Sequence, residues 1–360
     1  MGNSDKNIPE KEADFKHIWH IISQYVLPSL ISTLLIVVFF REVNLRQVWQ
    51  IVRGDCNMWM IGLMMIFSVM AIAIRGIRWG IQLRGVGIPR MPALAEMSAL
   101  LSASVLNVAF PRLGEAWRCI YVSRRQHCPF MTVLGTDIGD RTCDLICVFA
   151  FIAIALGVAH SEIINFMHHY EVGRVIGDVI DRLWVWIAIV VVVCALLALM
   201  RYGSRYEWVE SMKKGLSNMW QGFAVLFRMP QLGLYVWLTV LLWGATYMAT
   251  YVAYFAFPFT RDLILEPHMH WGISMGFVTL LFGVCSTAVP SNGGLGPWTL
   301  AIAYSLEVFG VAKEDAVSYA LVVWGFQTIA YMISGGASFV YIYYHRRKER
   351  LMEEHGAQSH

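Results

Sequence analysis

The stretch Asn107-Val-Ala-Phe-Pro-Arg-Leu-Gly-Glu-Ala-Trp-Arg118 interrupts apolar sequence with a proline, a glycine and three charged residues. Pro111 has no backbone N–H and Gly114 disfavours a helix interior, so the stretch predicts a break between two helices. Broken backbone at membrane depth persists only where it is buried in protein or lines a wet cavity. A helix starting near Gly114 would direct its free N–H groups, together with Arg112 and Arg118, toward the break. The stretch therefore predicts a binding site for an anionic head group.

Composition indicates the class of protein. Of the 360 residues, 57% are hydrophobic and only 15% are charged, and the mean hydropathy is +0.54. Several apolar runs reach the roughly 20 residues that cross a bilayer, which predicts an all-α, polytopic membrane protein. The net charge of +3 is too small to indicate a nucleic-acid partner. No cysteine or histidine spacing is typical of a metal site, so we expect neither a metal nor a cofactor.

The apolar runs also predict where the helices lie. Membrane spans are expected at about residues 22–40, 58–77, 130–158, 183–200, 232–257 and 316–344. The apolar runs at about 93–110 and 271–289 each lead into a broken hairpin. Residues 41–53 and 201–228 have an apolar helical face and a basic polar one, so we expect them to lie in the membrane interface. The span at 58–77 finishes among Arg75, Arg78, Arg84 and Arg90.

Four charged residues, Asp137, Asp140, Arg141 and Asp144, occupy one face of the span at 130–158, because they are spaced i, i+3, i+4, i+7. A charge near the middle of a bilayer costs at least about 2.5 kcal/mol, so this face must be paired or hydrated. Two interpretations stay open. The face belongs to a functional cavity, or it is structural, either as an ion-pair network or with Asp137 at the membrane interface.

A second interruption, Pro290-Ser-Asn-Gly-Gly-Leu-Gly-Pro-Trp298, precedes the last span. Asn292, Gly293, Gly294 and Gly296 are substrate-binding candidates, because a glycine backbone can present its N–H groups to a ligand. The glycines can equally serve a tight turn and close helix packing. In the same way, Asn292 and Asn107 can cap broken helices instead of contacting substrate.

The two interruptions decide the expected topology. If both are re-entrant hairpins, the chain crosses six times and both termini are cytoplasmic, which places most of the 28 lysine and arginine residues on the inner side. We then expect a cytoplasmic segment at 1–21, one transmembrane domain at 22–344 and a basic cytoplasmic tail at 345–360.

The transmembrane domain also contains a possible inverted repeat. Residues 22–158 and 183–344 each consist of a span, an amphipathic segment, a span, a broken hairpin and a span, and the two halves begin on opposite sides. The two hairpins would then enter from opposed faces and meet near the midplane, where alternating-access transporters bind substrate.

Three motifs in order resemble the flippase-like family of the lysylphosphatidylglycerol synthase transmembrane region, whose members are also described as dolichol-phosphate-glucose synthetase-like. The family's patterns match Arg112, Gly114, Glu115 and Arg118; Asp140, Arg141 and Asp144; and Pro290, Gly293, Gly294 and Gly296. The resemblance covers about Ile22 to Tyr344 and implies that these residues contribute to a substrate path.

Two departures from the family limit what the resemblance implies. The family often has a glutamate about three residues after its last glycine, where this chain has Pro297, Trp298 and Thr299. The soluble synthase domain is also missing, so the resemblance implies the translocating half of such proteins without the synthetic half.

Three functions are compatible with these features. The first is a non-enzymatic flippase for an anionic phospholipid or a polyprenyl-phosphate-linked lipid, in a bacterial inner membrane. The second is a membrane transferase acting on a lipid phosphate, with Glu115 or Asp140 as general base. The third is a non-transporting scaffold that binds an envelope lipid or glycan synthesis enzyme.

Overall fold

The computed structural model describes residues 56–109, 113–158, 231–287 and 295–358, with the isolated positions Gly54, Lys214, Ser217, Trp220, Ala224 and Met229. The predicted segment at 1–21, the spans at 22–40 and 183–200, the amphipathic segment at 41–53 and most of that at 201–228 lie outside the described residues. So do Pro290, Arg112, Asn292, Gly293 and Gly294.

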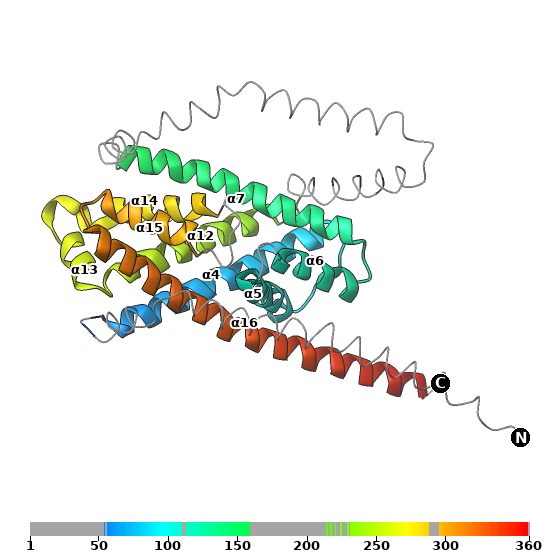
Figure 1. The fold of residues 1–360 in the computed structure, drawn as a ribbon. Helices are drawn as coiled ribbons and strands as arrows, with labels where there is room; N and C mark the ends of the chain where they lie inside the picture. The colour runs from blue at the N-terminus through cyan, green and yellow to red at the C-terminus, as the bar shows by residue number, and fades with distance from the viewer. Residues whose placement is uncertain are drawn as a thin grey trace, which may run out of the picture.

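Regular structure in the described residues is entirely helical, which confirms the all-α prediction (Figure 1). The elements are α4 (Met58–Gly85), α5 (Ala93–Ala109), α6 (Leu113–Arg125), α7 (Phe130–Val158), α12 (Leu232–Tyr254), α13 (Pro258–Ile264), η4 (Pro267–Gly272), α14 (Ile273–Ser286), α15 (Pro297–Glu307) and α16 (Lys313–Gln358).

Helix α4 is the central element of the described fold. It begins after Asn57, whose side-chain oxygen accepts the backbone N–H of Trp59 at 3.1 Å, a helix N-cap. It packs against α12, α5, α16 and α7. A polar side chain on α4 can therefore reach partners on several neighbouring helices.

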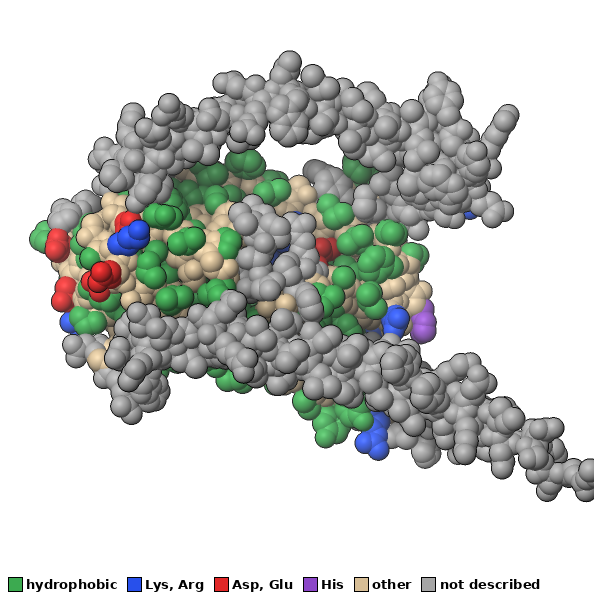
Figure 2. Space-filling model, viewed as in Figure 1, with side chains coloured by type: hydrophobic (Ala, Val, Ile, Leu, Met, Phe, Trp, Pro, Cys, Tyr) green, Lys and Arg blue, Asp and Glu red, His purple; other side chains and the backbone are tan. Residues whose placement is uncertain are grey.

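Three described helices are long and apolar enough to cross a membrane: α4, α12 and the part of α16 from Lys313 to His345. Helix α7 has 29 residues and is also long enough, but it carries the predicted charged face. On the face drawn in Figure 2, hydrophobic side chains cover the middle and most of the visible charged ones lie toward the two ends. This distribution is the one expected of a protein surrounded by lipid.

The short helices form two pairs that lie toward opposite ends of the described fold (Figure 1). Helix α5 packs against α6, and α14 packs against α15. The contacts also cross between the two halves of the chain, because α5 packs on α16 and α14 packs on α7. Neither half therefore forms its packing alone.

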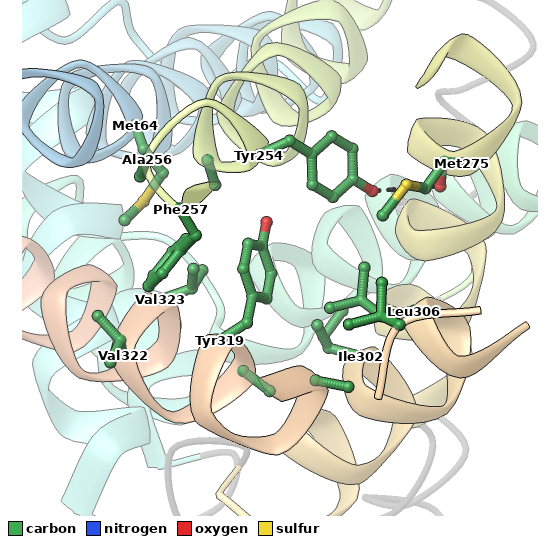
Figure 3. Close-up of a cluster of buried hydrophobic side chains, with 14 of the residues drawn as sticks. Met64, Tyr254, Ala256, Phe257, Met275, Ile302, Leu306, Tyr319, Val322 and Val323 are labelled. Carbon is green, nitrogen blue, oxygen red and sulfur yellow. Dashed lines mark hydrogen bonds between the residues drawn. The ribbon is translucent and has the colours of Figure 1, made fainter. Parts of the chain in front are cut away.

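An aromatic core joins α4, α12, α14, α15 and α16 away from the charged face of α7 (Figure 3). The ring of Tyr319 lies 5.0 Å from that of Phe257 and 5.9 Å from that of Tyr254, measured between centroids. The buried hydroxyl of Tyr254 donates a hydrogen bond to the backbone carbonyl of Met275 at 3.2 Å. This core fixes α12, α14 and α16 relative to one another.

The predicted helix boundaries hold for α5 and α7 but are wrong for the second span. Helix α4 continues beyond Ile77 to Gly85, and Arg78 and Gln82 are fully buried on it. Neighbouring helices provide partners for both side chains, since Arg78 contacts Asp140, Asp144 and Thr239 and Gln82 donates to the hydroxyl of Tyr235. At the other end of the chain, α16 extends through most of the predicted tail at 345–360.

Candidate functional site

The charged face of α7 meets charged residues of α4 and α6. Eight side chains are involved, and they divide by burial into two groups of four. The inner group consists of Arg78, Arg118, Asp137 and Asp140, whose side chains are at most 5% exposed. The outer group consists of Arg75, Glu115, Arg141 and Asp144, whose side chains are 16% to 49% exposed.

Within the inner group, Arg78 of α4 is paired with Asp140 of α7. Its Nη2 lies 2.7 Å from Oδ1 of Asp140, and its Nη1 donates to the hydroxyl of Thr239 on α12 at 3.3 Å. The hydroxyl of Tyr235 donates to the same Asp140 oxygen at 3.4 Å and accepts a hydrogen bond from Gln82 at 2.7 Å. The Arg78 guanidinium also lies 5.3 Å from the centre of the Tyr235 ring. Three helices therefore hold this charge pair.

The second arginine of the inner group is Arg118 of α6. It is ion-paired with Asp137, and its guanidinium lies 4.9 Å from the centre of the Trp79 ring on α4. The indole N–H of Trp79 donates to the hydroxyl of Thr136 at 3.0 Å, which fixes the ring under the arginine. Arg118, predicted to bind substrate, is thus enclosed by protein groups here, and its contact with a ligand stays a prediction.

The outer group links the same helices at a less buried level. Arg75 Nη2 lies 3.0 Å from Oδ2 of Asp144, and Arg78 Nη2 lies 2.8 Å from the other oxygen, Oδ1. Arg141 is ion-paired with Glu115 on α6. The spacing of Glu115 and Arg118, three residues apart on α6, would allow a pair within that helix, but the structure pairs Glu115 with Arg141 of α7 instead.

The two groups are electrically balanced, since four arginines face four carboxylates. Net neutrality lowers the cost of placing these charges among apolar helices, although each pair still loses hydration. The cluster is therefore not a preformed positive pocket. An anionic ligand has to compete with carboxylates for the arginines.

The predicted break lies between α5 and α6, next to this cluster. The backbone N–H of Gly114 donates to the side-chain oxygen of Asn107 at 2.8 Å. The indole N–H of Trp117 donates to the hydroxyl of Ser102 at 3.2 Å. Asn107 thus has the capping role that the sequence left open, and the Gly114 N–H is occupied.

The second break leads into α15. Gly296 has φ +85°, a backbone conformation that favours glycine, and Pro297 follows as the first residue of α15. The Gly296 N–H donates to the hydroxyl of Thr299 at 3.2 Å. These observations support a structural role for Gly296, while its contact with substrate stays a prediction.

The structure thus brings five predicted site residues into one cluster: Glu115, Arg118, Asp140, Arg141 and Asp144. Asp137 belongs to the same cluster, because its side chain is 5% exposed and paired with Arg118. Its position near the membrane interface stays a prediction. Among the described residues, no group of three or more His, Cys, Asp or Glu side chains is arranged to hold a metal ion.

Sequence reasoning did not assign Arg75, Arg78 or Gln82 to the site. All three lie on one face of α4, since they are spaced i, i+3, i+7, the same kind of signal that identified the charged face of α7. That spacing was available in the sequence, and it would have predicted a second polar face.

Together, fold and site define an all-α membrane protein with a buried, ion-paired charged cluster. Residues 25–335 match the family model described as "Lysylphosphatidylglycerol synthase TM region". The chain therefore belongs to this family and is an integral membrane protein with apolar helical spans. The match confirms the resemblance that the three motifs indicated. Comparisons with curated proteins and with solved structures give no match.

Proposed function

We propose that this protein moves an anionic lipid, a phospholipid or a polyprenyl-phosphate-linked lipid, across the membrane without changing it chemically. The observation that carries the proposal is the outer group, four charged side chains of α4, α6 and α7 that remain 16% to 49% exposed beside a buried inner group. Ionisable residues inside membrane proteins are costly and typically serve a substrate path. Because these members are partly exposed, a head group can reach them without separating the inner group.

The charge balance fits a transporter. With no ligand bound, every arginine of the cluster faces a carboxylate, so the empty site carries no net charge into the apolar surroundings. An entering phosphate replaces a carboxylate at one or two arginines, whose planar donors suit two phosphate oxygens at once. Binding by exchange is weaker than binding to unpaired arginines. Weaker binding suits a carrier, because a carrier must release its substrate on the other side of the membrane.

We further propose that the chain contains an inverted repeat. A pseudo-two-fold axis would relate α4 to α12, the α5/α6 pair to the α14/α15 pair, and α7 to α16. The crossed packing of α5 on α16 and of α14 on α7 supports this relation, because each contact is the counterpart of the other. The contact of α4 with α12 would then lie on the axis.

This repeat is part of the proposed topology of six crossings, two opposed re-entrant hairpins and two cytoplasmic termini. In such folds the substrate site lies where the hairpins meet near the midplane. The distribution of lysine and arginine supports the orientation. We propose a bacterial inner membrane as the location.

A liposome assay tests the function. Purified protein is reconstituted with phosphatidylglycerol that carries a fluorescent head-group-proximal label, and an impermeant quencher reports how much label becomes accessible from outside. We expect faster exchange than in protein-free liposomes, unchanged lipid mass, and slower exchange for Arg141→Gln than for Arg84→Gln. A changed lipid mass would identify a transferase. Neither movement nor a mass change would favour a scaffold that binds an envelope-synthesis enzyme.

A further inference from the structure

Arg75 is the residue of the cluster for which the structure indicates an exchangeable partner. Its guanidinium lies 3.0 Å from Oδ2 of Asp144, and 31% of its side chain is exposed. The other carboxylate oxygen, Oδ1, lies 2.8 Å from the fully buried Arg78. Asp144 therefore keeps an ion pair when Arg75 turns away from it.

Two other arginines of the cluster cannot turn away from their carboxylates in this way. Among the described residues, Arg78 is the arginine ion-paired with Asp140, and Arg141 is the arginine ion-paired with Glu115. If either arginine turned toward a ligand, it would leave a carboxylate without its ion pair, which is unfavourable in a poorly hydrated environment. Redirecting Arg75 avoids that cost.

Arg118 is unsuited to exchange its carboxylate for a ligand for a different reason. Its side chain is 4% exposed and is enclosed by Asp137 and the Trp79 ring. Its geometry suits a residue that positions α6 and α7. A ligand could reach it only after the inner group had separated.

We propose that Arg75 binds the phosphate of the lipid head group, exchanging the carboxylate of Asp144 for the phosphate oxygens. Asp144 stays bound to Arg78 and returns to Arg75 when the lipid leaves, so the site is neutral before and after each cycle. The inference rests on the proposed function only in taking a lipid as the source of the phosphate.

The chain provides a matched control in Arg84, nine residues further along α4. Arg84 is also paired with one carboxylate, that of Glu96, at 2.8 Å, and its side chain is 25% exposed. The two arginines therefore share helix and charge, have similar exposure and each have a carboxylate partner. They differ in that Arg84 lies outside the cluster and that its partner Glu96 is 4% exposed, against 16% for Asp144.

Native mass spectrometry of the full-length protein in detergent measures binding directly. Titration with phosphatidylglycerol should give a Kd for Arg75→Gln that is about 10- to 150-fold higher than that of the parent, the effect of losing a charge-assisted hydrogen bond. Arg84→Gln should stay within about twofold. An unchanged Kd for Arg75→Gln, or an equal loss for Arg84→Gln, would overturn the proposal.

Two further variants separate binding from a structural role. Arg75→Lys should fold and bind with intermediate affinity, because lysine keeps the charge without the two-pronged donor geometry. The double variant Arg75→Gln/Asp144→Asn removes both partners and should bind as weakly as Arg75→Gln. If the double variant regained the parent affinity, Arg75 would serve only to hold Asp144, and the proposal would be wrong.

The source of the phosphate is tested in the same titration. We expect inorganic phosphate at the concentration of the lipid to displace little phosphatidylglycerol, and phosphatidylcholine to bind more weakly than phosphatidylglycerol. Inorganic phosphate that bound as tightly, with the same dependence on Arg75, would show that the ligand is free phosphate and overturn the lipid assignment.

The two proposals can fail separately. Lipid that binds through Arg75 but does not cross the liposome membrane contradicts the transport function and leaves the binding site intact. Lipid that crosses at the parent rate with Arg75→Gln, whose Kd is also unchanged, contradicts the binding site and leaves transport intact.

Discussion

Gly114 lies so close to Ala103 that a β-carbon built on it would be 2.0 Å from the Ala103 carbonyl oxygen. The first turn of α6 therefore folds back onto α5 at a separation that only glycine permits. The glycine of the opening motif is accounted for by this backbone approach, which also places Glu115 and Arg118 toward α7.

We expect Gly114→Ala to destabilise the protein by about 1–3 kcal/mol, because the methyl group must displace backbone atoms. Thermal unfolding in detergent measures the change. Gly62→Ala is the control, because a β-carbon on Gly62 of α4 meets nothing within 4 Å. An equal effect of both substitutions would contradict the close contact.

Arg78→Ala should be far more damaging than Arg75→Ala. Loss of Arg78 leaves the buried Asp140 without its arginine, which typically costs about 3–5 kcal/mol, whereas loss of the partly exposed Arg75 leaves Asp144 paired and should cost about 1 kcal/mol or less. Folded yield and unfolding temperature report the difference. Similar losses of stability for the two variants would contradict the view that only Arg78 leaves a buried carboxylate without its ion pair.

The third prediction concerns α7. Asp137→Ala should destabilise the protein more than Arg141→Ala does, because Asp137 neutralises the buried Arg118, while the Arg141 side chain is 49% exposed. The sequence alone suggests the reverse order, since Asp137 lies nearer the helix end. A double-mutant cycle of Asp137→Asn with Arg118→Gln measures their coupling, which we expect to reach about 0.5–3 kcal/mol. Additive losses would exclude a direct pair.

The topology is tested by single cysteines in a background without the seven native cysteines. Lys313 begins α16 and the apolar part of this helix ends at His345, so positions 313 and 359 should lie on opposite sides of the membrane. An impermeant thiol reagent should label position 313 and not position 359 in intact cells. Labelling of position 359 alone would invert the proposed orientation.

Local features of this fold could be predicted because they depend on spacing along one helix. Asp137, Asp140, Arg141 and Asp144 share a face of any helix, whatever surrounds it. The interruption at Pro111 and Gly114 follows from backbone chemistry in the same way, and α5 and α6 indeed end and begin around it. The sequence therefore predicts the members of the charged cluster that lie on α6 and α7.

The partners within the cluster could not be predicted in this way. Arg118 follows Glu115 by three residues, a spacing that allows an ion pair within α6. In the structure, however, Glu115 pairs with Arg141 of α7. Which carboxylate Arg78 meets depends on the rotation of α4 relative to α7. That rotation is set by packing across the whole bundle, including α12 and α16, and not by local propensity.

The order of the charged residues along the chain bears on how the protein is made. All eight members of the inner and outer groups lie between Arg75 and Asp144. The arginines and carboxylates can thus neutralise one another while the second half of the chain is still being synthesised, so that the insertion machinery transfers a neutral group of helices to the lipid. The apolar side of α5, by contrast, waits for α16, which is synthesised well after Asp144. Electrostatic pairing can therefore come early in biogenesis, and completion of the apolar packing must come late.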